Sequence, residues 1–119
     1  MKKYKIPAED IRPVAMGYGM CVVPDTILVQ GMPVRMMYRV MPSRRQDSGW
    51  RFFSGTETTS YLADPRYNGL YDVNVVANYC PNIIENLDAP PYSAYELVDY
   101  GSEQRWVDIS LSSDWSTLA

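Results

Sequence analysis

The stretch Asp47-Ser48-Gly49-Trp50-Arg51-Phe52-Phe53-Ser54-Gly55-Thr56-Glu57 decides how the rest of the chain is organised. It contains both phenylalanines of the protein and one of its three tryptophans, and turn-forming residues enclose these aromatics on each side. A run of this kind is typical of a short strand that is buried on both faces. Because large aromatic side chains bury more area than others, we expect Trp50, Phe52 and Phe53 to form the centre of the core.

Alternating apolar and polar residues predict a second strand just before this stretch. Residues 34–41 place apolar side chains on one face and Arg35 and Arg39 on the other. We therefore expect one face in the core and one face that is at least partly wet. The polar connector 42–49 is long enough for a loose hairpin into the aromatic strand. The two strands are predicted to pair antiparallel.

Turn and cap residues predict the elements that follow. A threonine of the 56–59 stretch can cap a short helix that Pro65 ends. Asn68-Gly69 predicts a turn into a minimal strand at residues 70–73.

Asn74 is a suitable cap for a helix over residues 75–79, and Pro81 suits the first turn of a second helix. Two alternating runs joined at Gly101-Ser102 predict a C-terminal hairpin within residues 92–109. The chain as a whole is then one α+β domain: a mainly antiparallel twisted sheet of about five strands with two or three short helices.

The length of 119 residues is that of a single domain. We expect residues 1–119 to form this domain, with the core in residues 14–109 and a flexible or loosely docked tail at residues 110–119. The start of the chain is basic but lacks the apolar run of a signal peptide, and no segment approaches membrane-spanning length. Cys21 and Cys80 are too few for a secreted disulfide framework, which favours reduced thiols and a cytoplasmic location. The sequence leaves a bridge between them open.

The absence of histidine restricts the chemistry. It removes the commonest general base, the Ser-His and Cys-His nucleophile arrangements and the usual zinc ligand sets. Carboxylates remain as the catalytic option, but those in the middle of the chain lack the spacing of a calcium loop. We therefore predict a protein that is not an enzyme and that needs no metal or other cofactor.

The net charge of −3 hides an asymmetry. Residues 1–51 hold nine Lys/Arg against four Asp/Glu, whereas residues 52–119 hold two against ten. The charges can simply pair across one sheet, or the second half can present an acidic face to a basic partner. Nucleic-acid binding is disfavoured, because no basic patch with interleaved aromatics is present.

The central block Asp47 to Gly55 resembles the most recognisable motif of the immunity protein 33 family of bacterial polymorphic toxin systems, a family formerly of unknown function. The resemblance covers roughly residues 20–98 and continues through Tyr61-Leu62, Gly69-Leu70-Tyr71-Asp72-Val73-Asn74, Ala77-Asn78-Tyr79, Pro81-Asn82-Ile83-Ile84 and Leu87-Asp88-Ala89-Pro90. The chain departs from the family at Cys80, where an acidic residue is expected, and in the tail after Ile109.

The resemblance implies a cytoplasmic α+β protein, monomeric or dimeric, that binds a cognate toxin and blocks it without catalysis. Combined with the charge asymmetry, it suggests that Glu57, Asp64 and Glu85 contact a basic toxin surface. Two alternatives stay open. One is a small-ligand or enzyme domain with a carboxylate pocket beside Trp50, in which Glu57 or Asp72 is buried and perturbed. The other is a homo-oligomeric scaffold joined through the C-terminal hairpin.

Overall fold

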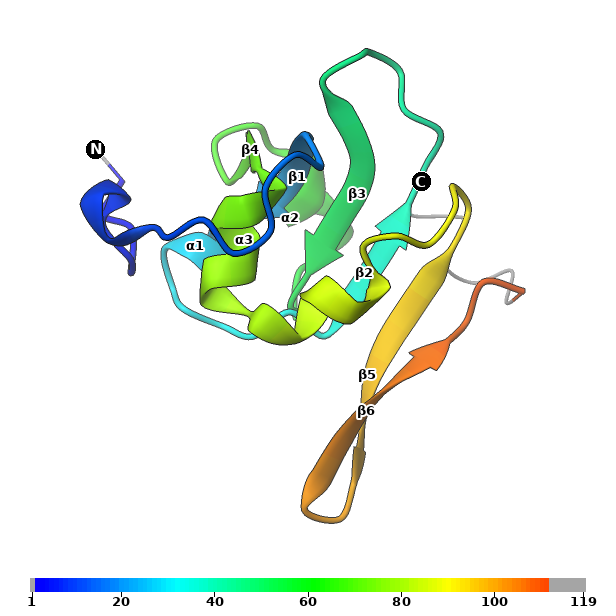
Figure 1. Cartoon of the computed structure of the whole chain (residues 1–119). Coiled ribbons are helices and arrows are strands. Elements are labelled where there is room, and N and C mark those ends of the chain that lie inside the picture. The colour runs from blue at the N-terminus through cyan, green and yellow to red at the C-terminus, as the bar shows by residue number, and fades with distance from the viewer. Residues whose placement is uncertain (1, 112–119) are drawn as a thin grey trace.

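One six-stranded mixed sheet organises residues 2–111, the part of the chain that this computed structural model describes (Figure 1). The strand order is β4-β1-β3-β2-β5-β6. The strands are β1 (Met20–Pro24), β2 (Met36–Arg39), β3 (Asp47–Phe53), β4 (Asn68–Asp72), β5 (Ala94–Tyr100) and β6 (Glu103–Asp108). The predicted tail lies, from residue 112 onward, outside the described residues.

Five short helical segments precede or connect these strands within the described residues. They are the 3-10 helices η1 (Ala8–Asp10) and η2 (Pro81–Asn86) and the α-helices α1 (Asp25–Leu28), α2 (Thr59–Ala63) and α3 (Val73–Tyr79). The α+β class is therefore confirmed, but the sheet has six strands rather than about five. None of the described helices is long and apolar enough to cross a membrane.

The aromatic strand β3 lies inside the sheet, parallel to β1 and antiparallel to β2. The predicted antiparallel pairing of β2 with β3 is thus confirmed. Trp50 and Phe52 have no exposed surface, and they belong to a core that joins β1, β2 and β3 to α1, α3 and η2. Phe53 points to the other face of the sheet, where it stacks on Tyr38 at a ring-centroid distance of 5.4 Å.

Strand β4 corrects the prediction at Asn68-Gly69. These residues do not form a turn, because they begin the strand and pair with Val23 and Pro24 of β1. The side-chain amide of Asn68 donates to the backbone oxygens of Tyr61 and Asp64, at 2.8 and 2.9 Å. The Asn68 side chain therefore satisfies backbone oxygens at the end of α2 instead of forming a turn. Strand β4 is also longer than the sequence predicts.

The cap of α3 also differs from the prediction. Asp72 rather than Asn74 is the N-cap, and its carboxylate accepts a hydrogen bond from the Asn74 backbone N–H at 2.8 Å. Asn74 lies inside the helix, where its side-chain oxygen accepts from the backbone N–H groups of Val14 and Ala15, both at 2.8 Å. The asparagine therefore fixes the N-terminal segment against α3.

Other local predictions are confirmed. The hydroxyl of Thr58 caps α2 by accepting from the Tyr61 backbone N–H at 3.1 Å. Pro81 lies in the first turn of η2. Strands β5 and β6 pair antiparallel around Gly101-Ser102 as the predicted hairpin, which extends away from the rest of the sheet in Figure 1.

Candidate functional site

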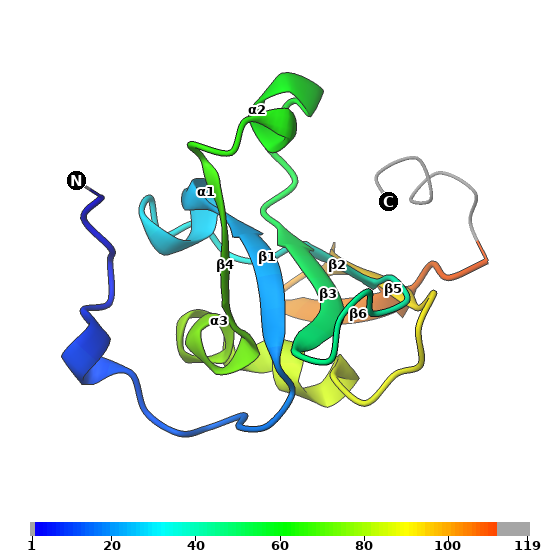
Figure 2. The same cartoon turned by 90° about the horizontal axis from the view of Figure 1, so that it is seen from above.

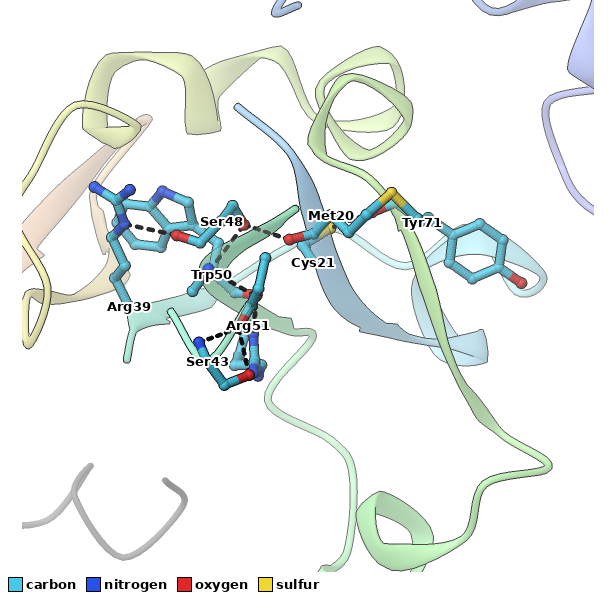
Figure 3. Close-up of polar contacts among 10 residues, drawn as sticks. Met20, Cys21, Arg39, Ser43, Ser48, Trp50, Arg51 and Tyr71 are labelled. Carbon is cyan, nitrogen blue, oxygen red and sulfur yellow. Dashed lines mark hydrogen bonds and ion pairs between the residues drawn. The ribbon is translucent and has the colours of Figure 1, made fainter. Parts of the chain in front are cut away.

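The central motif forms a junction between β1 and β3 (Figure 3). The Ser48 hydroxyl donates to the Met20 backbone oxygen at 2.6 Å and accepts from the Trp50 backbone N–H at 3.1 Å. The register of the two strands shifts at this point. A small hydroxyl side chain thus satisfies backbone groups that the irregular ladder leaves over.

Asp47 fixes the turn that leads into this junction. Its carboxylate accepts from the backbone N–H groups of Gly49 and Ser43 and from the Arg51 guanidinium, at 2.9, 3.2 and 3.3 Å. Partial burial by itself raises the pKa of Asp47, but these hydrogen bonds and the charge of Arg51 outweigh it, and the pKa lies below its usual value. A carboxylate held ionised in this way is poorly suited to proton transfer near pH 7.

Arg39 lies on the face of β2 that is predicted to be at least partly wet, and its side chain is half-buried. Its guanidinium lies over the Trp50 ring, 5.8 Å from the centroid. The Nε group donates to the Ser48 backbone oxygen at 2.8 Å (Figure 3). Nη1 donates to the Ala89 backbone oxygen at 2.7 Å. The charge is tolerated there because its donors are paired and its flat face covers an aromatic ring.

A cavity of about 330 Å³ opens beside the motif, and its lining includes Arg44, Asp47, Arg51 and Leu70. Neither Glu57 nor Asp72 contributes to it, and Trp50 is fully buried. The two acids therefore do not form the carboxylate pocket beside Trp50 that the enzyme alternative requires. The acid that does line this cavity, Asp47, is paired with Arg51.

The thiols of Cys21 and Cys80 are both free and buried. Burial raises the pKa of each thiol, so neither has the thiolate character of a nucleophile. Within residues 2–111 no group of three or more cysteine and acidic side chains is placed to hold a metal ion.

Glu57, the first predicted partner-binding residue, is directed into its own chain. Its carboxylate accepts from the Ser54 backbone N–H at 3.0 Å, the Ser54 hydroxyl at 2.6 Å, the Gly55 N–H at 3.1 Å and the Thr26 hydroxyl. Desolvation raises the pKa of Glu57, yet these donors outweigh it and the pKa is lowered. The side chain holds the loop after β3 against α1.

Asp64 and Glu85 have different environments. Asp64 ends α2 and forms a two-pronged ion pair with Arg66, with a shortest contact of 2.7 Å between Nη2 and Oδ2. Hydrogen bonds from Arg66 lower the pKa of Asp64. Glu85 lies exposed on η2, and no ion pair holds it within the described residues. The three predicted residues do not form one cluster, because α2 and η2 lie on opposite sides of the molecule in Figure 2.

The acidic surface that the structure does form is the hairpin of β5 and β6. Its four acids, all exposed, are accompanied by one basic residue, Arg105; the acids are Glu96, Asp99, Glu103 and Asp108. Tyr100 at the tip is 53% exposed. At the base, the Trp106 indole N–H donates to the Asn82 backbone oxygen of η2 at 2.8 Å. This contact places the helix that carries Glu85 against the hairpin.

Sequence reasoning considered this hairpin only as the joint of a homo-oligomeric scaffold and missed its concentration of negative charge, although a signal was present. Counting charge over each predicted element, rather than over half of the chain, isolates four acids and one arginine in residues 94–108. The alternation of β5 and β6 spreads the acids over both faces of the hairpin. The element as a whole, rather than one face of the domain, therefore carries the negative charge.

These features define a small α+β protein with a projecting acidic hairpin. A family model described as the immunity protein Imm33 domain matches residues 21–108, from the first strand to the end of the last. The match covers most of the chain, and the chain belongs to this family. Comparisons with curated proteins and with solved structures found no significant match.

Proposed function

We propose that this protein is a bacterial immunity protein that binds a cognate toxin in the cytoplasm and blocks it without catalysis of its own. The family membership supports an immunity role. The arrangement of ionisable groups supports a binding role, because Asp47 and Glu57 are held ionised by internal donors and both thiols are buried and protonated. The toxin then meets a surface, not a reactive centre.

The observation that indicates which surface binds the toxin is the negative charge of the β5–β6 hairpin. An element with four exposed acids and one arginine attracts a basic protein and accelerates its association. Tyr100 adds an amphipathic side chain of the kind that is enriched at interfaces. Glu85 lies exposed on η2, the helix that contacts Trp106 of the hairpin, and adds one more acid to this part of the protein.

We propose different roles for Glu57 and Asp64, the other two residues predicted to contact the toxin. Glu57 acts as a support, since all its hydrogen bonds hold the loop after β3. Asp64 contributes little net charge to a partner, because Arg66 neutralises it on the surface. Of the three, Glu85 is the contact that we expect a toxin to make.

Co-expression with the product of the neighbouring gene tests the function. The expected result is a complex that survives purification and growth of cells that the neighbouring protein alone kills. Failure to bind or to relieve toxicity for every adjacent gene product would remove the proposal.

A charge variant tests the surface. Replacing Asp99→Asn together with Glu103→Gln should slow association with the toxin and weaken its dependence on salt, because steering by exposed charges is screened by ions. The matched control is Glu9→Gln with Asp10→Asn, which removes the same charge from η1, an exposed helix far from the hairpin in Figure 1. Equal effects of the two double variants would show that only the net charge matters.

A further inference from the structure

Within residues 2–111, strand β6 is an outer strand of the sheet, with β5 on one side only. The hydrogen-bonding direction of each residue follows from the register. Leu97 of β5 donates its backbone N–H to the Arg35 oxygen at 2.8 Å, on the side away from β6. Its partner Trp106 therefore also directs its backbone groups away from β5, because the two residues form a pair that is not hydrogen-bonded.

The same alternation extends along the strand. Just after the C-terminal end of β6, Ile109 donates its N–H to the Ala94 oxygen of β5 at 2.8 Å. This bond confirms which residues of β6 direct their backbone groups towards β5. Gln104, Trp106 and Asp108 thus turn their N–H and C=O groups to the free edge, while Glu103, Arg105 and Val107 use theirs on β5. Three regularly spaced residues offer a complete template for one more strand.

The opposite edge of the sheet differs. Strand β4 runs directly into α3 at Asp72, and Asn68 at its start is bound to the end of α2. A strand added to β4 would meet helices at both ends. The β5–β6 hairpin instead projects away from the described helices (Figure 1). Strand β6 begins next to the turn with the exposed positions Glu103, Gln104 and Arg105.

Charge selects the kind of strand that fits. Two copies of this hairpin would bring together two elements that each carry four acids and one arginine, and opposed like charges destabilise a strand pair. A strand with lysine or arginine would instead lie beside Glu103 and Asp108. The edge therefore favours a basic partner over a second copy of the chain.

We propose that the toxin of this immunity protein adds a basic strand to β6, so that backbone hydrogen bonds from Gln104, Trp106 and Asp108 extend the six-stranded sheet into the partner. This inference rests on the proposed function and specifies its contact. Backbone pairing supplies the affinity and the flanking acids select positive side chains, as in other proteins that bind by strand addition.

The first experiment measures amide hydrogen exchange in the free protein and in its complex with the co-purified product of the neighbouring gene. Exchange at Gln104, Trp106 and Asp108 should slow in the complex. The internal control is the set Glu103, Arg105 and Val107, whose amides bond to β5 in both states. Unchanged exchange at the three outward amides would overturn the inference.

The second experiment compares Gln104→Pro with Gln104→Ala. Proline removes one outward N–H and is tolerated at a strand edge, whereas alanine removes the same side chain and keeps the N–H. Gln104→Pro should weaken toxin binding about tenfold, because one backbone hydrogen bond to the toxin strand is lost and the proline ring occupies the place of the N–H. Gln104→Ala should bind like the unmodified chain.

The outcomes separate the two proposals. If Gln104→Pro keeps the unfolding midpoint of the original chain and still binds the toxin equally well, strand addition is wrong while the immunity function stands. If the original chain binds no neighbouring product at all, the proposed function itself fails. Dimerisation of the free protein that Gln104→Pro abolishes would reassign the edge to a second copy.

Discussion

The two ends of the sheet are stabilised in different ways. Strands β4, β1 and β3 are covered by helices on one face, and the core there contains fully buried residues such as Val23, Trp50, Val76 and Leu87. The β5–β6 hairpin has exposed residues over most of its outer half and is held by its own ladder, by the pairing of the start of β5 with β2 and by Trp106. We therefore expect most of the folding stability to come from the half that the helices cover. The hairpin half contributes less to stability and is available for binding.

The largest test of this contrast replaces one tryptophan in each half. Trp50→Ala should lower the free energy of unfolding by about 3–5 kcal/mol, since it leaves a large cavity and removes the indole donor of the Leu87 backbone oxygen. Trp106→Ala should cost clearly less, because this side chain is only partly buried. Urea unfolding of both variants makes the comparison, and equal losses would contradict the division into two halves.

The buried centre could be predicted from sequence because its cause is local. Two phenylalanines and a tryptophan lie close together between turn residues, and side chains this large are buried in almost any fold. The burial of Trp50 therefore follows from the local sequence. Arg39 lies on the face predicted to be at least partly wet and is half-buried, but alternation alone does not show that a second layer covers part of that face. That layer comes from residues such as Ala89, 50 positions later in the chain.

The candidate site was harder to predict, and Glu57 shows why. The carboxylate binds the backbone N–H three residues earlier, the geometry of a capping box, although Ser54 starts no helix. The Ser54-x-x-Glu57 spacing is visible in the sequence and is a signal for an internal role. The contact with Thr26, in contrast, depends on the tertiary fold and has no local signal.

A second prediction concerns this glutamate and pH. Glu57→Gln should lower the free energy of unfolding by about 1–2 kcal/mol at pH 7, because hydrogen bonds to a charged acceptor are lost from a half-buried site. The folded-state pKa of Glu57 is lowered, so its contribution is present above the pKa of the unfolded chain and is lost as the pH falls through the folded-state pKa. The difference between the two proteins should therefore shrink in acid.

Urea unfolding at a series of pH values from neutral to acid measures this difference. The matched control is Glu85→Gln, the same substitution at an exposed position on η2, which should leave stability at neutral pH nearly unchanged. We expect the opposite order for binding, since Glu85 lies exposed on the helix that contacts the hairpin, whereas Glu57 is directed into its own chain. A loss of toxin affinity in a folded Glu57→Gln protein, without loss in Glu85→Gln, would reverse the roles assigned to them.

Only a small change in stability is expected for Arg105 at the hairpin. Its guanidinium pairs with Glu103 at 3.0 Å and lies 5.5 Å from the Tyr100 ring centroid, but all of these groups are solvent-exposed. Arg105→Ala should change the free energy of unfolding by less than about 0.5 kcal/mol. Its effect on binding should be larger than its effect on stability, because it removes the one positive charge of the hairpin.

The direction of that effect discriminates between electrostatic steering and a specific contact. A basic toxin should associate about twofold faster with Arg105→Ala than with the original chain, while Glu103→Gln should slow association, and both differences should vanish at high salt. Stopped-flow measurements at low and high ionic strength give the two rates. If Arg105→Ala slowed association instead, the arginine would itself meet an acidic group of the toxin. The hairpin would then present a mixed-charge surface rather than an acidic one.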